Sequence, residues 1–133
     1  MDGRWVVVAA INGLLAVVAG AFGAHALREH LTERSMATFE TAARYQMYHA
    51  LALLAVAALL ANSQSRSARV AGIFMLAGIA LFSGSLYWIA LCEDAPAWLG
   101  PVTPIGGVFL MLGWFSLAIS GFRAARGGGA TRA

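Results

Sequence analysis

Four apolar segments dominate this chain, and each is long enough to cross a lipid bilayer as a helix. They cover residues 5–27, 45–61, 70–91 and 105–122, which are 23, 17, 22 and 18 residues. A membrane-crossing helix needs about 20 apolar residues, with a range of roughly 17–25. Helices pair every backbone amide internally, and the alternation of a barrel strand is absent. We therefore predict an all-α fold, with a single four-helix transmembrane bundle over residues 1–126.

The composition suits a lipid environment. Hydrophobic residues make up 60% of the 133 residues and charged residues only 11%, against about 25% charged in soluble domains. All nine basic residues are arginines that separate the apolar runs. A nucleic-acid binder would gather such charge on one soluble face, so no nucleic-acid partner is expected. The single cysteine, Cys92, excludes an internal disulfide and a cysteine-only metal cage.

The first segment also has two features of a signal peptide. Arg4 precedes it, and Ala24-His25-Ala26 near its end has an A-x-A pattern. Its apolar stretch is longer than the usual 7–15 residues of such a peptide. We therefore expect it to remain as the first transmembrane helix.

The arginines favour one orientation in the membrane. Six lie on the side of the two termini, namely Arg4, Arg66, Arg69, Arg123, Arg126 and Arg132. Three lie on the opposite side, namely Arg28, Arg34 and Arg44. Because positive charge accumulates in cytoplasmic loops, both termini are predicted to be cytoplasmic. The lysine-free, alanine- and arginine-rich composition is typical of a GC-rich bacterial genome.

The segment 28–44 joins the first two predicted spans and is itself predicted to be helical. Thr32 or Ser35 can cap a helix start by accepting a hydrogen bond from a free amide. Leu31, Met36 and Phe39 follow with mainly helical spacing, so we predict a short amphipathic interfacial segment that runs into the second span. The glycine-rich segment 127–133 is predicted to be a flexible tail.

Polar residues gather where the apolar segments end on the non-cytoplasmic side. The four clusters are residues 20–25, 45–49, 82–87 and 103–107. With the predicted topology they lie within about two helical turns of the outer interface. Their candidate functional residues are His25, Tyr45, Gln46, His49, Ser83, Ser85, Tyr87 and Thr103.

This polar cluster has three interpretations. The first is structural hydrogen bonding between helices, and the second is contact with a small ligand or ion. The third assigns His25 and His49 to a metal or a haem. Two histidines without a companion ligand are a weak metal signal, because catalytic zinc usually has three protein ligands. We accordingly predict no catalytic residue, no metal site and no cofactor.

Small residues along the spans predict where helices approach closely. Lipid does not press helices together, so small side chains that allow close backbone contact do much of that work. The candidate packing glycines are Gly13, Gly20, Gly23, Gly84, Gly106, Gly107 and Gly113. Three spans with small faces indicate a compact bundle.

Five motifs occur in a fixed order, at residues 20–25, 45–49, 81–87, 103–107 and 113–114. This ordered set resembles the YgdD/YwdK-like family of small inner-membrane proteins, or domain of unknown function 423, over about residues 10–122. The resemblance implies several membrane spans and a location in the bacterial inner (cytoplasmic) membrane. It implies no catalytic residues, because no activity is established for the family.

The sequence therefore predicts a non-enzymatic, small packing or accessory membrane protein. Its expected partners are the lipid bilayer and either a second copy of itself or a larger membrane complex. The alternative is binding or transport of a small molecule or ion by the polar cluster. A metal or haem protein using His25 and His49 is the third hypothesis.

Overall fold

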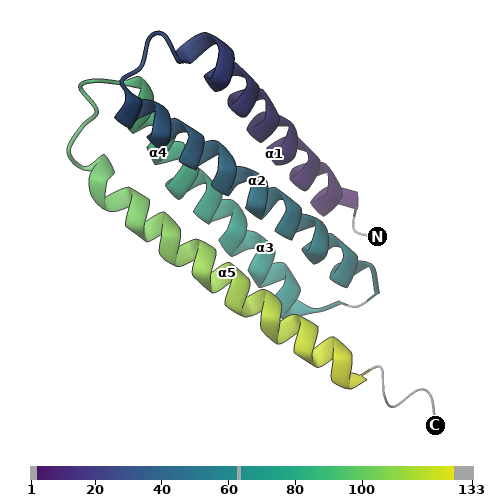
Figure 1. The fold of residues 1–133 in the computed structure, drawn as a ribbon. Coiled ribbons are helices and arrows are strands. Elements are labelled where there is room, and N and C mark those ends of the chain that lie inside the picture. The colour runs from purple at the N-terminus through teal and green to yellow at the C-terminus, as the bar shows by residue number, and fades with distance from the viewer. Residues whose placement is uncertain (1–2, 63, 128–133) are drawn as a thin grey trace.

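The computed structural model describes residues 3–62 and 64–127, which form long helices joined by short loops (Figure 1). The elements in chain order are α1 (Gly3–Phe22), η1 (Gly23–Leu27), α2 (Glu33–Asn62), α3 (Arg66–Gly78), η2 (Ile79–Ser83), α4 (Gly84–Leu91) and α5 (Leu99–Gly127). The two η elements are single π-helical turns, and η2 joins α3 and α4 into one rod. Four helices are long and apolar enough to cross a membrane. The predicted all-α, four-span fold is confirmed.

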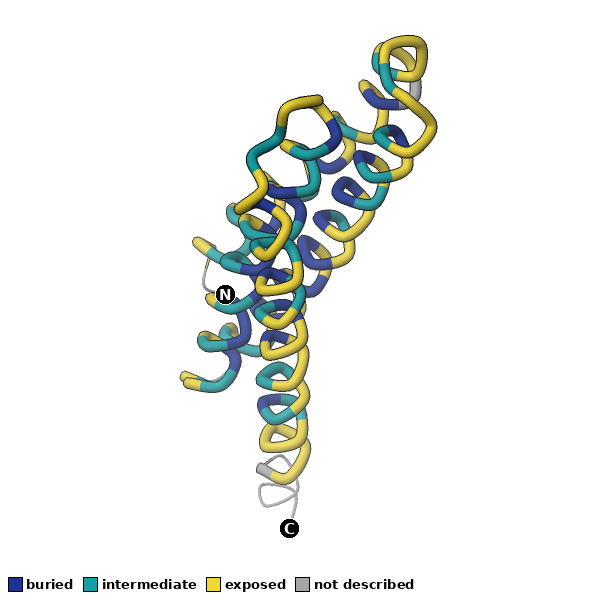
Figure 2. The backbone as a smooth tube through the Cα atoms, turned by 90° about the vertical axis from the view of Figure 1, so that its left-hand side faces the viewer, coloured by how far each residue is buried: buried dark blue, intermediate teal, exposed yellow. Residues whose placement is uncertain are grey.

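The helices form an up-and-down arrangement with both chain ends at the same end of the molecule (Figure 1). α1 packs mainly on α2, α2 packs on the α3–η2–α4 rod, and that rod packs on α5. Because α1 and α5 are the two outer helices, they are the more exposed ones along most of their length (Figure 2).

α2 is longer than its apolar stretch and absorbs the predicted interfacial segment. It has 30 residues, and the backbone N–H of Ser35 donates to Thr32 Oγ1 at 3.1 Å, so Thr32 caps its start. The turns before Tyr45 bury Met36 and Phe39 against Ala90 of α4. The predicted tail lies, from residue 128 onward, outside the described residues.

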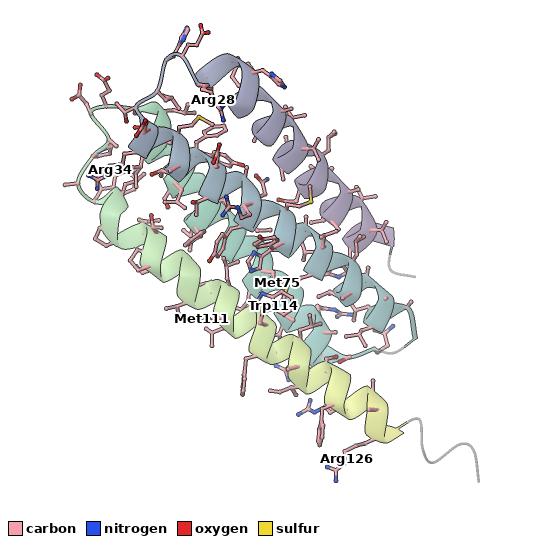
Figure 3. The ribbon with its side chains drawn as sticks, viewed as in Figure 1. Arg28, Arg34, Met75, Met111, Trp114 and Arg126 are labelled. Carbon is pink, nitrogen blue, oxygen red and sulfur yellow. The ribbon has the colours of Figure 1, made fainter. Side chains whose placement is uncertain are left out.

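The core is built where α2, α3 and α5 meet. Leu53, Val56 and Met75 are fully buried there, together with Leu110 of α5. Met75 lies near mid-length of the helices (Figure 3). Small neighbours, Ala52 and Ala71 among them, let the larger side chains interdigitate.

Three of the candidate packing glycines lie at tight contacts. A Cβ added at Gly106 would meet the backbone of Phe82 and lie 2.8 Å from the carbonyl carbon of Leu81. At Gly113 it would lie 2.7 Å from Met75 Cγ, and at Gly23 2.8 Å from the Phe39 ring. Such distances are shorter than van der Waals contact. At Gly106 the neighbouring helix backbone would have to shift, whereas at Gly23 and Gly113 the neighbouring side chains would have to move.

The other candidate glycines are less confined. Added Cβ atoms at Gly13 and Gly107 make ordinary contacts of 3.9 Å and 3.8 Å. Gly20 and Gly84 do not lie at a helix contact, because a Cβ there meets nothing within 4 Å in the described part of the chain. Gly20 instead lines a crevice of about 340 Å³ between α1 and α2.

Two close contacts come from glycines of α3 that the sequence prediction did not include. A Cβ at Gly72 would collide with the Trp5 ring, and one at Gly78 with the side chain of Leu110. In the third span, the close contacts are therefore made by Gly72 and Gly78 of α3 rather than by Gly84 of α4.

Candidate functional site

A chain of hydrogen bonds joins three helices through Gln46, which is 7% exposed. The Tyr87 hydroxyl of α4 donates to Gln46 Oε1 at 2.9 Å. Gln46 Nε2 in turn approaches Asn12 Oδ1 of α1 at 3.5 Å, and Asn12 Nδ2 donates to the Val8 carbonyl at 2.9 Å. Gln46 therefore connects α1 and α4 to α2, and its amide groups are used within the protein.

His49 makes a second connection, between α2 and α5. The Trp114 indole N–H donates to His49 Nε2 at 3.1 Å, and His49 Nδ1 lies 2.6 Å from the Tyr45 carbonyl oxygen. A carbonyl can only accept, so Nδ1 carries the proton and Nε2 accepts from the indole. The ring is neutral in this arrangement, and both of its nitrogens are occupied. Figure 3 shows Trp114 on the side of α5 that faces the other helices.

His49 and Trp114 both lie far from the starts of their helices. His49 follows the start of α2 by 16 residues, and Trp114 follows the start of α5 by 15. At about 1.5 Å per residue, both lie more than 20 Å from the outer helix ends. The twelve residues of α2 that precede Tyr45 belong to the predicted interfacial segment, so the end of α2 is not the predicted membrane surface. One outer layer of polar residues stays a prediction.

The predicted pairing of His25 with His49 does not occur. Gly23 of η1 faces Phe39 of α2, and His49 lies ten residues further along α2, about 15 Å away. His25 itself has an exposed side chain. Within the described ranges, no three histidine, cysteine, aspartate or glutamate side chains are grouped to hold a metal ion. The two histidines therefore cannot bind one metal or haem.

The serine and threonine candidates form a separate contact nearer the helix ends. Ser85 Oγ donates to the Phe82 carbonyl at 3.0 Å and lies 2.7 Å from Thr103 Oγ1 of α5. Ser83 Oγ is buried and has no hydrogen-bond partner among the described residues. The remaining candidate, Tyr45, packs its ring on Phe82 with ring centroids 4.8 Å apart.

Residues outside the prediction complete these contacts. Asn12 of α1 is not among the candidate site residues, although its Oδ1 lies 3.5 Å from Gln46 Nε2 of α2. Trp114 belongs to the motif at residues 113–114 but is not among the candidate site residues, although its indole N–H donates to His49 Nε2. A polar atom in the middle of an apolar span is the sequence signal that could have identified both.

The Gln46–Tyr87 bond gives a first testable prediction. Tyr87→Phe and Gln46→Leu should each lower the free energy of unfolding by about 1 kcal/mol, within the range of interhelical hydrogen bonds in membranes. The double variant should lose less unfolding free energy than the sum of the two single losses, because both single changes remove the same Tyr87–Gln46 bond. Unfolding by SDS in mixed micelles measures these values. Tyr48→Phe is the control, since its hydroxyl has no hydrogen-bond partner among the described residues and its side chain is 52% exposed. Strict additivity would contradict the bond.

The His49 ring gives a second prediction. Nitrogen NMR of histidine-labelled protein should show His49 protonated at Nδ1 and unprotonated at Nε2, as its two partners require. Trp114→Phe should shift mainly the Nε2 signal. His30, which is exposed in the loop before α2, is the internal control. A His49 ring protonated at Nε2 would show that the indole bond is absent.

The four long apolar helices and the buried polar contacts between them define an integral membrane protein with four helical spans. A family model described as "Protein of unknown function (DUF423)" matches residues 19–107. The chain belongs to this DUF423 family, whose curated relatives are called UPF0382 membrane proteins.

Three relatives show how far the similarity extends. A UPF0382 membrane protein of Staphylococcus epidermidis is 42% identical over 87% of this chain and 93% of its own length. YwdK of Bacillus subtilis is 42% identical over 87% of this chain and 94% of its own. A relative from Haemophilus influenzae is 40% identical over 93% and 98%. No solved structure matches the chain significantly.

Proposed function

We propose that this protein is a non-enzymatic packing or accessory protein of the bacterial inner membrane. The observation that carries the proposal is that its buried polar side chains mostly bond one another. Gln46 joins Asn12 and Tyr87, and His49 is occupied by Trp114 and the Tyr45 carbonyl. Reactive groups poised for catalysis would need to be free and to converge on one point. These groups instead hold the helices in a fixed arrangement.

The proposal includes an orientation with both termini in the cytoplasm. It is supported by the arginine distribution and by the two chain ends lying at the same end of the molecule (Figure 1). Cys92 is a free, exposed cysteine at the opposite end. A membrane-impermeant maleimide should therefore label it in cells whose outer barrier has been permeabilised. Gln64→Cys in a Cys92→Ala background is the matched control and should react only after the inner membrane is opened. The reverse pattern would overturn the orientation.

The accessory role requires a protein surface that meets a partner within the membrane. α1 supports this role, because it exposes a row of large apolar residues along most of its length: Val7, Ile11, Leu14, Leu15, Val17, Val18 and Phe22. Acyl chains alone can cover such a face, so the partner must be tested directly.

Two measurements test the accessory role. Native mass spectrometry after purification in mild detergent should detect either a dimer or a partner in constant stoichiometry. In membranes, Leu14→Cys in a Cys92→Ala background should form an intermolecular cross-link, since this side chain is 63% exposed. Leu53→Cys, at a fully buried position, is the control. A monomer with neither a partner nor a cross-link would contradict the accessory role.

A second function, binding of a lipophilic small molecule, is supported by one crevice. This crevice of about 320 Å³ lies between α2 and α5 and is lined by Tyr45, Tyr48, His49, Gly107, Leu110, Met111 and Trp114. Aromatic rings with two phenol hydroxyls suit an apolar ligand with one polar group. Mass spectrometry of all compounds bound after mild purification tests this function. Gly107→Leu should fill the crevice and remove the ligand, whereas Gly100→Leu, on the same helix but outside the crevice, should not.

A further inference from the structure

A cleft of about 510 Å³ separates the beginnings of α1 and α3, at the end of the molecule that holds both termini. Its lining residues are Arg4, Trp5, Val8, Arg69 and Leu76. The arginines are exposed, whereas the three apolar side chains are half-buried. The cleft therefore combines two positive charges with an apolar wall.

The polar and apolar parts of the cleft are separated along the helix axes. Val8 lies one turn beyond Arg4 on α1, and Leu76 lies seven residues beyond Arg69 on α3. At about 1.5 Å per residue, the apolar wall extends roughly 6–10 Å from the arginines toward the middle of the membrane. A bilayer has the same order along this direction, with charged headgroups at the surface and acyl chains toward the middle.

Trp5 forms one wall of the cleft, and its ring is held in place by α3. Its ring occupies the space that Gly72 leaves open on α3, so that a Cβ at this position would collide with the ring. The contact holds the start of α1 against α3 and sets the spacing between Arg4 and Arg69. Tryptophan is also the residue that prefers the headgroup level of a bilayer.

The two guanidinium groups have no carboxylate partner within the described residues. Arg69 makes one hydrogen bond, from Nη2 to Gln64 Oε1 at 3.3 Å, and no hydrogen bond of the Arg4 side chain occurs within residues 3–62 and 64–127. A guanidinium offers five N–H donors and binds phosphate oxygens in a bidentate manner. The charge in the cleft is therefore available to an anion.

We propose that this cleft binds one anionic phospholipid. The lipid phosphate lies between Arg4 and Arg69, and an acyl chain lies along Val8 and Leu76. Basic pockets between transmembrane helices are known to bind anionic headgroups on the cytoplasmic side. The inference goes beyond the proposed accessory role, because it assigns a lipid class and a site that hold whether or not a protein partner exists.

Native mass spectrometry of the detergent-purified protein tests the site. Titration with phosphatidylglycerol should produce a one-lipid complex, and phosphatidylethanolamine with the same acyl chains should bind at least tenfold more weakly. Arg4→Gln/Arg69→Gln should weaken phosphatidylglycerol binding on the order of 30-fold, since each arginine near an anionic surface contributes about fivefold. Arg4→Lys/Arg69→Lys should restore most of the binding, because it keeps both charges.

The matched control is Arg123→Gln/Arg126→Gln, which removes the same charge from the end of α5, outside the cleft (Figure 3). It should leave the affinity for the one bound lipid within about twofold, because neither arginine lines the cleft and interactions of solvent-exposed charges are weakened by salt. Glycerol phosphate at the lipid concentration should not displace phosphatidylglycerol, because it lacks the acyl chain.

Three outcomes would overturn the proposal. They are equal binding of the two lipids, an equal loss in the α5 control, or full displacement by glycerol phosphate, which would indicate a site for soluble phosphate. Thermal unfolding of each variant separates lost binding from lost folding. If the cleft variant does not fold, Leu76→Trp, which fills the apolar part and keeps both arginines, should reduce binding at least tenfold. Unchanged binding in that variant would also overturn the proposal.

Discussion

Gly106→Ala is expected to lower the free energy of unfolding by about 3 kcal/mol, at the upper end of the cost of overpacking a well-packed interior. The added methyl group would meet the backbone of Phe82 and lie 2.8 Å from the carbonyl carbon of Leu81. A flexible side chain can rotate away from such a contact, but a helix backbone cannot. α5 would have to move away from η2, which would also separate Thr103 from Ser85. SDS unfolding in mixed micelles measures the change.

Gly107→Ala is the matched control for this prediction. A Cβ there would lie 3.8 Å from the Phe82 ring, an ordinary contact. Alanine is also the better helix former by up to about 1 kcal/mol, so this variant should be as stable as the original chain or slightly more stable. Equal loss in the two variants would show that α5 and η2 are not in backbone contact at Gly106.

The sequence predicted the helices because their signal is local. The segment 70–91 has no charged residue in 22 positions, and a helix is the form in which such a segment pairs its own amides. The cap of α2 is equally local, because Thr32 accepts from the N–H three residues later. Neither feature depends on how the helices are arranged relative to one another.

The position of one helix along another could not be predicted in the same way. The pairing of His49 with Trp114 depends on how far α2 is displaced along α5. Apolar segments can slide past one another in lipid with little change in exposed apolar area, so hydrophobicity does not define their offset. The specific bonds of His49 and Gln46 define it, and these involve residues far apart in the sequence.

Leu53→Ala should lower the free energy of unfolding by about 2 kcal/mol, toward the lower end of values for such truncations in buried cores. Leu53 is fully buried where α2 meets α3 and α5, so the change leaves a cavity that Met75 and Val56 line. Loss of dispersion contacts supplies most of the cost, because lipid tails are as apolar as a protein interior and transfer contributes little.

Leu54→Ala removes the same atoms from the adjacent position, where the side chain is 43% exposed. Lipid can fill the space left there, so this variant should stay within about 0.5 kcal/mol of the original chain, as is usual for exposed positions. The difference between the two variants measures packing alone, since both lose the same side chain from the same helix. If Leu54→Ala cost as much as Leu53→Ala, the face of α2 that contains Leu54 would be packed against protein, which would favour an oligomer that covers this helix.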